Sequence, residues 1–154
     1  MTKRSVTHAS FTLERSYDQP PPRVFKAFAD TEAKLRWFAG GEGWETAEYK
    51  LDFKVGGREI WRGSPKGGPK VRNDTIYRDI IPDERIISAY DMFINDDRIS
   101  CSLLTVEFSS KGKGTQLKIT EQGAFLDGHD DPKMRESGWG GLLDSLGKEL
   151  QRKE

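Results

Sequence analysis

The hydrophobic and polar positions of this chain change their spacing twice. Phe11, Leu13 and Tyr17 alternate with polar residues, which predicts a half-buried strand. Beyond Pro20-Pro21-Pro22 the spacing becomes helical, because prolines fit the first turn of a helix and apolar residues then recur three or four apart. The pattern predicts two short helices, the first with Val24, Phe25 and Phe28 and the second with Leu35, Trp37 and Phe38.

From about Trp44 to Gly123 the apolar residues recur every second position, which predicts a series of strands. We expect them to cover residues 47–53, 59–61, 73–81, 85–93, 99–108 and 115–122. The later connections are short and rich in Pro, Asp, Asn and Gly, as hairpin turns are. Consecutive strands with short turns form an antiparallel meander, since parallel strands need long crossover connections.

The last element is predicted to be a long amphipathic helix that starts after Asp130 or Asp131 as N-cap. Its apolar stripe consists of Trp139, Leu142, Leu143, Leu146 and Leu150. Four glycines interrupt it, at 138, 140, 141 and 147, and each costs about 1 kcal/mol relative to Ala. The helix therefore needs tertiary packing, and its glycines either let another backbone approach closely or leave room beside it.

Together these patterns predict one α+β domain over residues 1–154 with a helix-grip fold. A curved antiparallel sheet of about six or seven strands wraps around the long C-terminal helix, and two short helices follow the first strand. Residues 1–8 and 151–154 are expected to be frayed ends.

Composition narrows the class of protein. Hydrophobic residues make up 34% of the chain and charged residues 32%, so the core must be compact and rich in rings. Twenty-five basic residues balance 25 acidic ones, which argues against a nucleic-acid partner. No apolar run approaches the ~20 residues of a membrane span. Cys101 is the one cysteine, and no signal peptide is visible. We expect a cytoplasmic monomer or small homo-oligomer.

Several short motifs resemble the bacterial homologues of the activator of heat-shock protein 90 ATPase, within the START-like, or SRPBCC, superfamily of proteins like the birch-pollen allergen. The motifs occur in order along nearly the whole chain. They are Glu14-Arg15, Pro20, Val24–Phe28, Trp37-Phe38, Asp52–Arg58, Pro82–Ile86, Gly114-Thr115, Gly138-Trp139 and the leucines 142, 143 and 146.

This resemblance implies the helix-grip fold and three possible functions. Members of the superfamily bind lipids, hormones or polyketides, some are cyclases or hydrolases, and one branch stimulates a chaperone. Fold alone does not choose among these. The chain departs from the family pattern at Lys54, where Arg is more usual, and at Glu59, where an aromatic is common.

Glu59 is the most informative candidate site residue. It alternates with Trp61, so both side chains point to the same side of the sheet. If that side faces the helix, Glu59 is an acid in an apolar cavity whose pKa is raised by desolvation, able to bind a ligand or act as acid or base. The alternative is a strand-end carboxylate paired with a Lys or Arg at the rim. Glu121 likewise has two interpretations: a carboxylate at the mouth of the cavity, or a solvent-exposed residue at the end of its strand.

The remaining candidates are rings and small hydroxyls that could line a cavity or simply fill the core. They are Phe38, Tyr49, Tyr77, Ser88, Tyr90, Ser102, Trp139 and Leu143. The pattern does not decide whether Ser88, Tyr90 and Met92 or the opposite face of their strand points inward.

No catalytic constellation is visible, and no cofactor is predicted. The carboxylates of Asp127–Asp131 with His129 could indicate a metal, but a helix cap already accounts for one of them and a second ligand cluster is missing. The leading hypothesis is a module that binds a small hydrophobic or amphipathic molecule. A partner of the heat-shock protein 90 chaperone and a cavity enzyme that uses a buried Glu are the alternatives.

Overall fold

The computed structural model describes residues 3–39 and 41–153. Its helices are α1 (Pro21–Ala29), α2 (Thr31–Phe38) and α3 (Pro132–Leu150). Its strands are β1 (Val6–Tyr17), β2 (Trp44–Leu51), β3 (Arg58–Pro65), β4 (Val71–Ile81), β5 (Arg85–Ile94), β6 (Asp97–Lys111) and β7 (Gly114–Leu126). Met1, Thr2 and Glu154, at the ends predicted to fray, lie outside the described residues.

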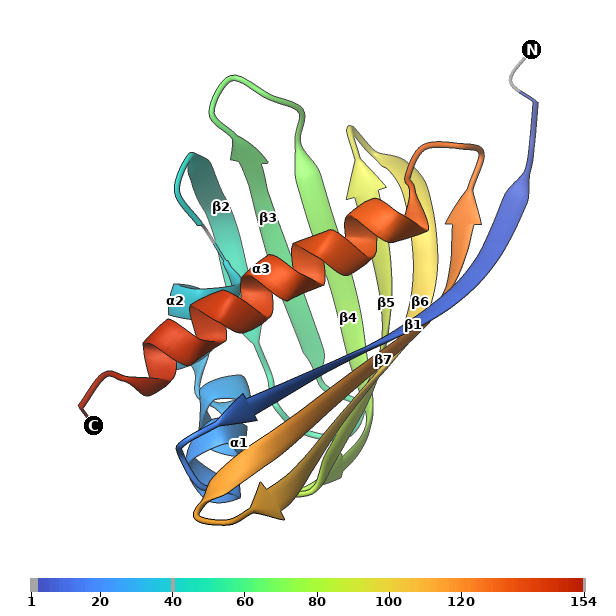
Figure 1. Cartoon of the computed structure of the whole chain (residues 1–154). Coiled ribbons are helices and arrows are strands. Elements are labelled where there is room, and N and C mark those ends of the chain that lie inside the picture. Colours follow the sequence, from blue (N-terminus) through green and yellow to red (C-terminus); the bar gives the residue numbers. More distant parts are fainter. Residues whose placement is uncertain (1–2, 40, 154) are drawn as a thin grey trace.

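Within the described residues the strands form one antiparallel sheet in the order β1-β7-β6-β5-β4-β3-β2. Strands β2 to β7 are a meander, and β1 pairs with β7 at the edge. Figure 1 shows α3 crossing the concave face of this curved sheet, with α1 and α2 beside its C-terminal half. The predicted helix-grip fold is confirmed.

Local chemistry fixes the starts and turns of these elements. Asp30 accepts a hydrogen bond from the backbone N of Ala33 and caps α2, and Asp131 caps α3 through the N of Lys133. The β5–β6 turn places Asn95 and Asp96 at positive φ, a conformation that these two residue types tolerate. Hairpins of this kind could be recognised from the sequence because the turn residues themselves determine the backbone.

Two details differ from the sequence prediction. The strand expected to run to Phe53 ends at Leu51, where the chain turns so that the N of Asp52 donates to the carbonyl of Arg58. A bulge between Thr46 and Glu48 leaves Ala47 exposed.

The N-terminal end is also more regular than expected. Val6–His8 were predicted to fray, but β7 runs on to Leu126 and pairs with them through Leu126, Phe125 and Ala124. The extension of β7 past Gln122 thus gives β1 a partner along its whole length.

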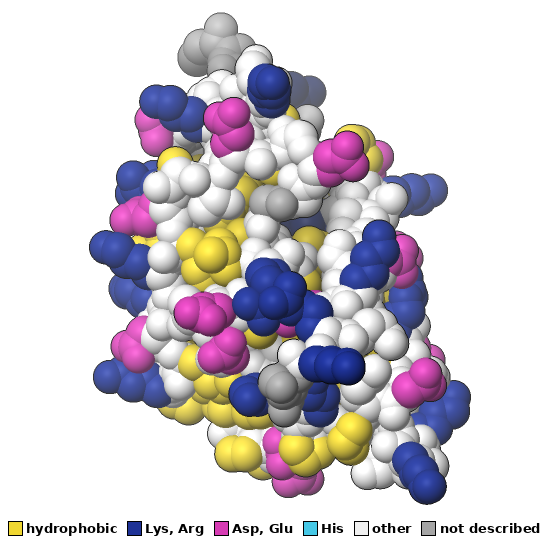
Figure 2. Space-filling view, turned by 90° about the vertical axis from the view of Figure 1, so that its left-hand side faces the viewer, with side chains coloured by type: hydrophobic (Ala, Val, Ile, Leu, Met, Phe, Trp, Pro, Cys, Tyr) yellow, Lys and Arg dark blue, Asp and Glu magenta, His cyan; other side chains and the backbone are white. Residues whose placement is uncertain are grey.

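The core lies between the concave face of the sheet and the helices. Leu143 and Leu146 of α3, Val24 of α1 and Ile119 of β7 are almost completely buried in it. Figure 2 shows a mixture of basic and acidic side chains on the side where α3 ends, with hydrophobic side chains visible between them. This face therefore carries no continuous surface of one charge.

An ion pair joins α2 to the end of α3. Arg36 donates from Nε and Nη2 to the two carboxylate oxygens of Glu149, both at 2.8 Å. The hydrogen bonds from Arg36 lower the pKa of Glu149 below its ordinary value of 4.5. Arg36 is partly exposed, so the contribution of this pair to stability is reduced by solvent.

We expect Glu149→Gln to lower the free energy of unfolding at pH 7 by about 1–2 kcal/mol, because bonds to a charged group are lost. A carboxylate with a lowered folded-state pKa stabilises fully above its unfolded pKa and loses this contribution as pH falls through the folded value. The difference between parent and variant should therefore shrink below about pH 4.5. Urea unfolding at a series of pH values measures this difference in stability. Asp144→Asn, a change at an exposed position of α3, is the control. Equal stability of the parent and Glu149→Gln at pH 7 would contradict the expectation.

Candidate functional site: a cavity between sheet and helix

A cavity of about 570 Å³ lies between the concave face of the sheet, α2 and α3. All four tryptophans of the chain line it: Trp37 from α2, Trp44 from β2, Trp61 from β3 and Trp139 from α3. Sites of this volume accept drug-sized molecules, and they are typically apolar with a few placed polar groups. The rings come from four separate elements, so the fold itself assembles this site.

Seven of the eleven candidate residues line this cavity. They are Phe38, Glu59, Trp61, Tyr77, Ser88, Tyr90 and Trp139. The other four, Tyr49, Ser102, Glu121 and Leu143, do not belong to the lining. Tyr49 and Glu121 bond to the lining residues Glu59 and Tyr90, Ser102 bonds to Glu121, and Leu143 belongs to the hydrophobic core.

The inward face of β5 is the one that carries Ser88, Tyr90 and Met92, which all line the cavity. Register explains this, because Ser88 pairs with Tyr77 and Tyr90 pairs with Thr75, both buried residues of β4. The sequence left this choice open, since both faces of β5 carry apolar residues. On the outer face the ring of Phe93 is covered instead by the guanidinium of Arg72, 4.0 Å from its centroid.

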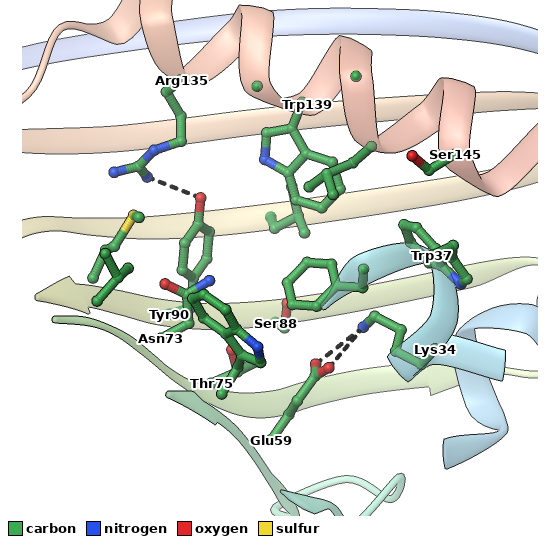
Figure 3. A pocket seen from close by; sticks show the side chains of 18 of the residues that line it. Lys34, Trp37, Glu59, Asn73, Thr75, Ser88, Tyr90, Arg135, Trp139 and Ser145 are labelled. Atoms are coloured by element: carbon green, nitrogen blue, oxygen red, sulfur yellow. Dashed lines mark hydrogen bonds and ion pairs between the residues drawn. The ribbon is translucent and has the colours of Figure 1, made fainter. Parts of the chain in front are cut away.

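Glu59 lines the cavity with Trp61 and is only 4% exposed, so the face that the two residues share is the inward one. The carboxylate of Glu59 nevertheless has partners within the protein. Lys34 of α2 lies 3.0 Å from both carboxylate oxygens, and the hydroxyls of Tyr49 and Tyr77 donate to Glu59 at 2.6 and 2.7 Å. Figure 3 shows Lys34 and Glu59 pointing toward one another at one end of the cavity. The pairing joins α2 to β3.

A second buried carboxylate lies behind the lining at the other end of the cavity. Glu121 of β7 is fully buried and accepts hydrogen bonds from Tyr90, Ser102, Trp139 and Arg135 at 2.6–3.1 Å. The prediction that it lies near a strand end was wrong, because β7 continues to Leu126. All oxygen sites of Glu121 have partners in the protein, so its role is to join the sheet to α3.

Both networks hold their phenols in the protonated form. Burial, followed by the nearby charge of Glu59, raises the pKa of Tyr49 and of Tyr77. Burial and Glu121 likewise raise the pKa of Tyr90. Burial acts to lower the pKa of Arg135, but its contacts with Tyr90, Glu121 and Asp130 raise it overall. The tyrosines therefore act as hydrogen-bond donors to the carboxylates.

The sequence analysis missed the two basic residues of these networks. Arg135 lies four residues before Trp139, on the extended apolar stripe of α3, and Lys34 lies four residues before Phe38 on α2. A long charged side chain on an apolar helical face is a usable signal, because it must find a buried partner there. The partners themselves come from distant strands.

The glycines of α3 have two different surroundings. A Cβ added to Gly138 or Gly141 would meet nothing within 4 Å, and both residues line the cavity. A Cβ at Gly147 would instead lie 3.4 Å from the ring of Tyr17, whose hydroxyl donates to the carbonyl of Leu143 at 2.7 Å. The glycines of α3 thus have both of the expected roles. Gly138 and Gly141 leave room beside the helix, and Gly147 lets a neighbouring side chain approach closely.

The acidic loop before α3 has structural partners. Asp127 accepts from the backbone N of Ser5 and from Arg4, Asp130 accepts from Arg135, and Asp131 caps α3. Across residues 3–39 and 41–153, no group of three or more His, Cys, Asp and Glu side chains gathers in a way that could hold a metal ion. In the same ranges, no helix has both the length and the apolar character needed to cross a bilayer.

Comparison with known proteins adds family information. A model of the family described as "Activator of Hsp90 ATPase homolog 1-like protein" matches residues 18–151. No curated protein matches the chain. The solved structure of the Mll3558 protein from Rhizobium loti is 51% identical, with 94% of this chain and 99% of that chain covered and a TM-score of 0.88.

Two further solved structures extend the comparison. An uncharacterized protein from Rhizobium leguminosarum is 41% identical over 99% of this chain and 100% of its own, with a TM-score of 0.94. An AHSA1-like protein from Aeromonas hydrophila is 21% identical over 95% of this chain and 98% of its own, with a TM-score of 0.69. The latter likeness concerns the fold alone.

Proposed function

The chain belongs to the Activator of Hsp90 ATPase homolog 1-like protein family, and from that premise we propose that it binds one small, mainly apolar molecule between the sheet and α3. The observation that carries this proposal is the cavity of about 570 Å³ lined by all four tryptophans. The fold of this family is consistent with ligand binding.

The lining supports an apolar ligand. Tryptophan rings offer large, rigid contact surfaces, and burying apolar area contributes about 25 cal/mol per Å². Ile86, Ile99, Leu104 and Val106 supply the rest of an apolar wall on β5 and β6. A molecule that fills this space would contact apolar side chains of the sheet, α2 and α3.

The geometry favours binding over catalysis. Glu59 and Glu121 are the buried carboxylates that an acid–base mechanism would use, but Lys34, Arg135 and three tyrosines occupy their oxygens. A general base needs a lone pair within reach of the proton it removes. Docking on the heat-shock protein 90 chaperone stays a prediction that rests on the family description.

The probe N-phenyl-1-naphthylamine tests the proposal, because this neutral molecule fluoresces in apolar surroundings and absorbs tryptophan emission. We expect one probe per chain to bind saturably and to quench tryptophan fluorescence, since every tryptophan borders the cavity. Native mass spectrometry then gives the stoichiometry. Absence of saturable binding, or probe emission that is unrelated to tryptophan quenching, would reject the cavity as a ligand site.

A further inference from the structure

Three polar side chains form a row on the sheet side of the cavity. Asn73 and Thr75 alternate along the inward face of β4, and Ser88 lies on the inward face of β5. Asn73 pairs with Met92, Thr75 pairs with Tyr90 and Ser88 pairs with Tyr77, so Thr75 lies between the other two side chains of the row. Figure 3 shows the row on the strands opposite Trp139 and α3.

Within the described residues, the polar atoms of this row make no side-chain hydrogen bond to the protein. The Oδ1 of Asn73 is buried and has no partner. Thr75 and Ser88 are 9% and 4% exposed, and neither hydroxyl takes part in the side-chain bonds of the two networks. Burying the Asn73 oxygen unpaired is costly, so it calls for a partner of another kind.

Other buried hydroxyls of the same sheet behave differently. Ser100 accepts from Arg135, Ser102 donates to Glu121, and Thr115 donates to the carbonyl of Gln19. A place on a buried strand of this sheet therefore does not explain why the side chains of the row lack a hydrogen-bond partner in the protein. What distinguishes Asn73, Thr75 and Ser88 is that they line the cavity, which the other three do not.

The charges around the cavity are already paired. Lys34 neutralises Glu59, and Arg135 lies between Glu121 and Asp130. An anion would enter beside three carboxylates without a free cation, and any ion would lose its hydration there. These surroundings favour an uncharged molecule.

We propose that the ligand is an uncharged ring compound that carries a hydroxyl or amide group, and that this group hydrogen-bonds within the row of Asn73, Thr75 and Ser88. The inference rests on the proposed function and specifies its ligand. The apolar body lies against Trp61 and Trp139, while the polar group supplies the donor and acceptor that the row lacks.

Displacement of N-phenyl-1-naphthylamine by four related molecules tests this inference. They are naphthalene, 2-naphthol, 2-naphthoate and 2-naphthylmethylammonium, which share two rings and differ in polar group and charge. We expect 2-naphthol to displace the probe best among the three polar molecules. The variant Asn73→Leu/Thr75→Val/Ser88→Ala should lower the affinity for 2-naphthol relative to that for naphthalene about fivefold to tenfold.

The matched control is Thr105→Val, which removes a hydroxyl from the outer face of β6. It should leave both affinities unchanged. The triple variant should also be at least as stable as the parent in urea, because it removes the unpaired buried oxygen of Asn73, and this checks that it folds.

The outcomes separate the two proposals. If the ratio of the two affinities is unchanged in the triple variant, or if the anion or the cation binds most tightly, the inference is overturned while the cavity remains a ligand site. If N-phenyl-1-naphthylamine itself does not bind the parent protein, the proposed function fails and the inference fails with it.

Discussion

Arg135→Met is expected to lower the free energy of unfolding by about 3–5 kcal/mol, the cost of breaking a buried ion pair by removing one partner. Arg135 bonds to Glu121, Tyr90 and Ser100 and pairs with Asp130, so its loss leaves a fully buried carboxylate without its cation. Methionine keeps a similar apolar stem, so packing changes little. Urea unfolding at pH 7 measures the effect.

A double-mutant cycle isolates the interaction between Glu121 and Arg135. Glu121→Gln/Arg135→Met removes both charges and should recover part of the stability lost in Arg135→Met alone, because no unpaired charge is left. Lys133→Met, an exposed change two residues earlier on the same helix, is the matched control and should shift stability by less than about 0.5 kcal/mol. A loss below about 1 kcal/mol for Arg135→Met would show that α3 does not depend on this network.

The second large effect concerns ligand binding. Gly138→Leu/Gly141→Leu is expected to weaken binding of N-phenyl-1-naphthylamine about 30-fold, or about 2 kcal/mol, because the new side chains extend into the cavity. No atom lies within 4 Å of a Cβ at either position, so each new side chain starts in open space. Replacing glycine inside a helix should also stabilise the fold. Affinity and stability are thus expected to move in opposite directions.

The control for this variant is Ser137→Leu/Asp144→Leu on the exposed side of α3. It places the same two leucines on the same helix without lining the cavity, and should leave the affinity within about twofold. If the glycine variant binds the probe as tightly as the parent does, then the space beside Gly138 and Gly141 is not where the ligand lies.

The element order could be predicted because its signals are local. Asp30 and Asp131 cap helices, Asn95-Asp96 forms a turn, and the apolar stripe of α3 repeats at helical spacing. Each of these depends on a few neighbouring residues. The bulge near Ala47 could not be predicted, since an extra residue in a strand changes the pairing without any marked change in the pattern.

The site was predictable only in part. Alternation correctly placed Glu59 on the same face as Trp61, but it left open whether that face points inward, and its partner Lys34 is 25 positions away on α2. Glu121 and Arg135 are brought together by the crossing of β7 and α3. The sequence shows that a buried charge needs a partner, whereas the packing of helix on sheet selects which residue it is.

The most direct test of ligand binding is the ¹⁵N–¹H spectrum of the four tryptophan indoles, recorded while N-phenyl-1-naphthylamine is added. Trp37, Trp44, Trp61 and Trp139 each line the cavity, so we predict that all four indole signals shift together and saturate at one probe per chain. Backbone signals of Cys101 and Leu103, on the outer face of β6, should stay in place. Indole signals that do not move at saturating probe, or shifts confined to the outer face, would contradict a ligand held between sheet and helix.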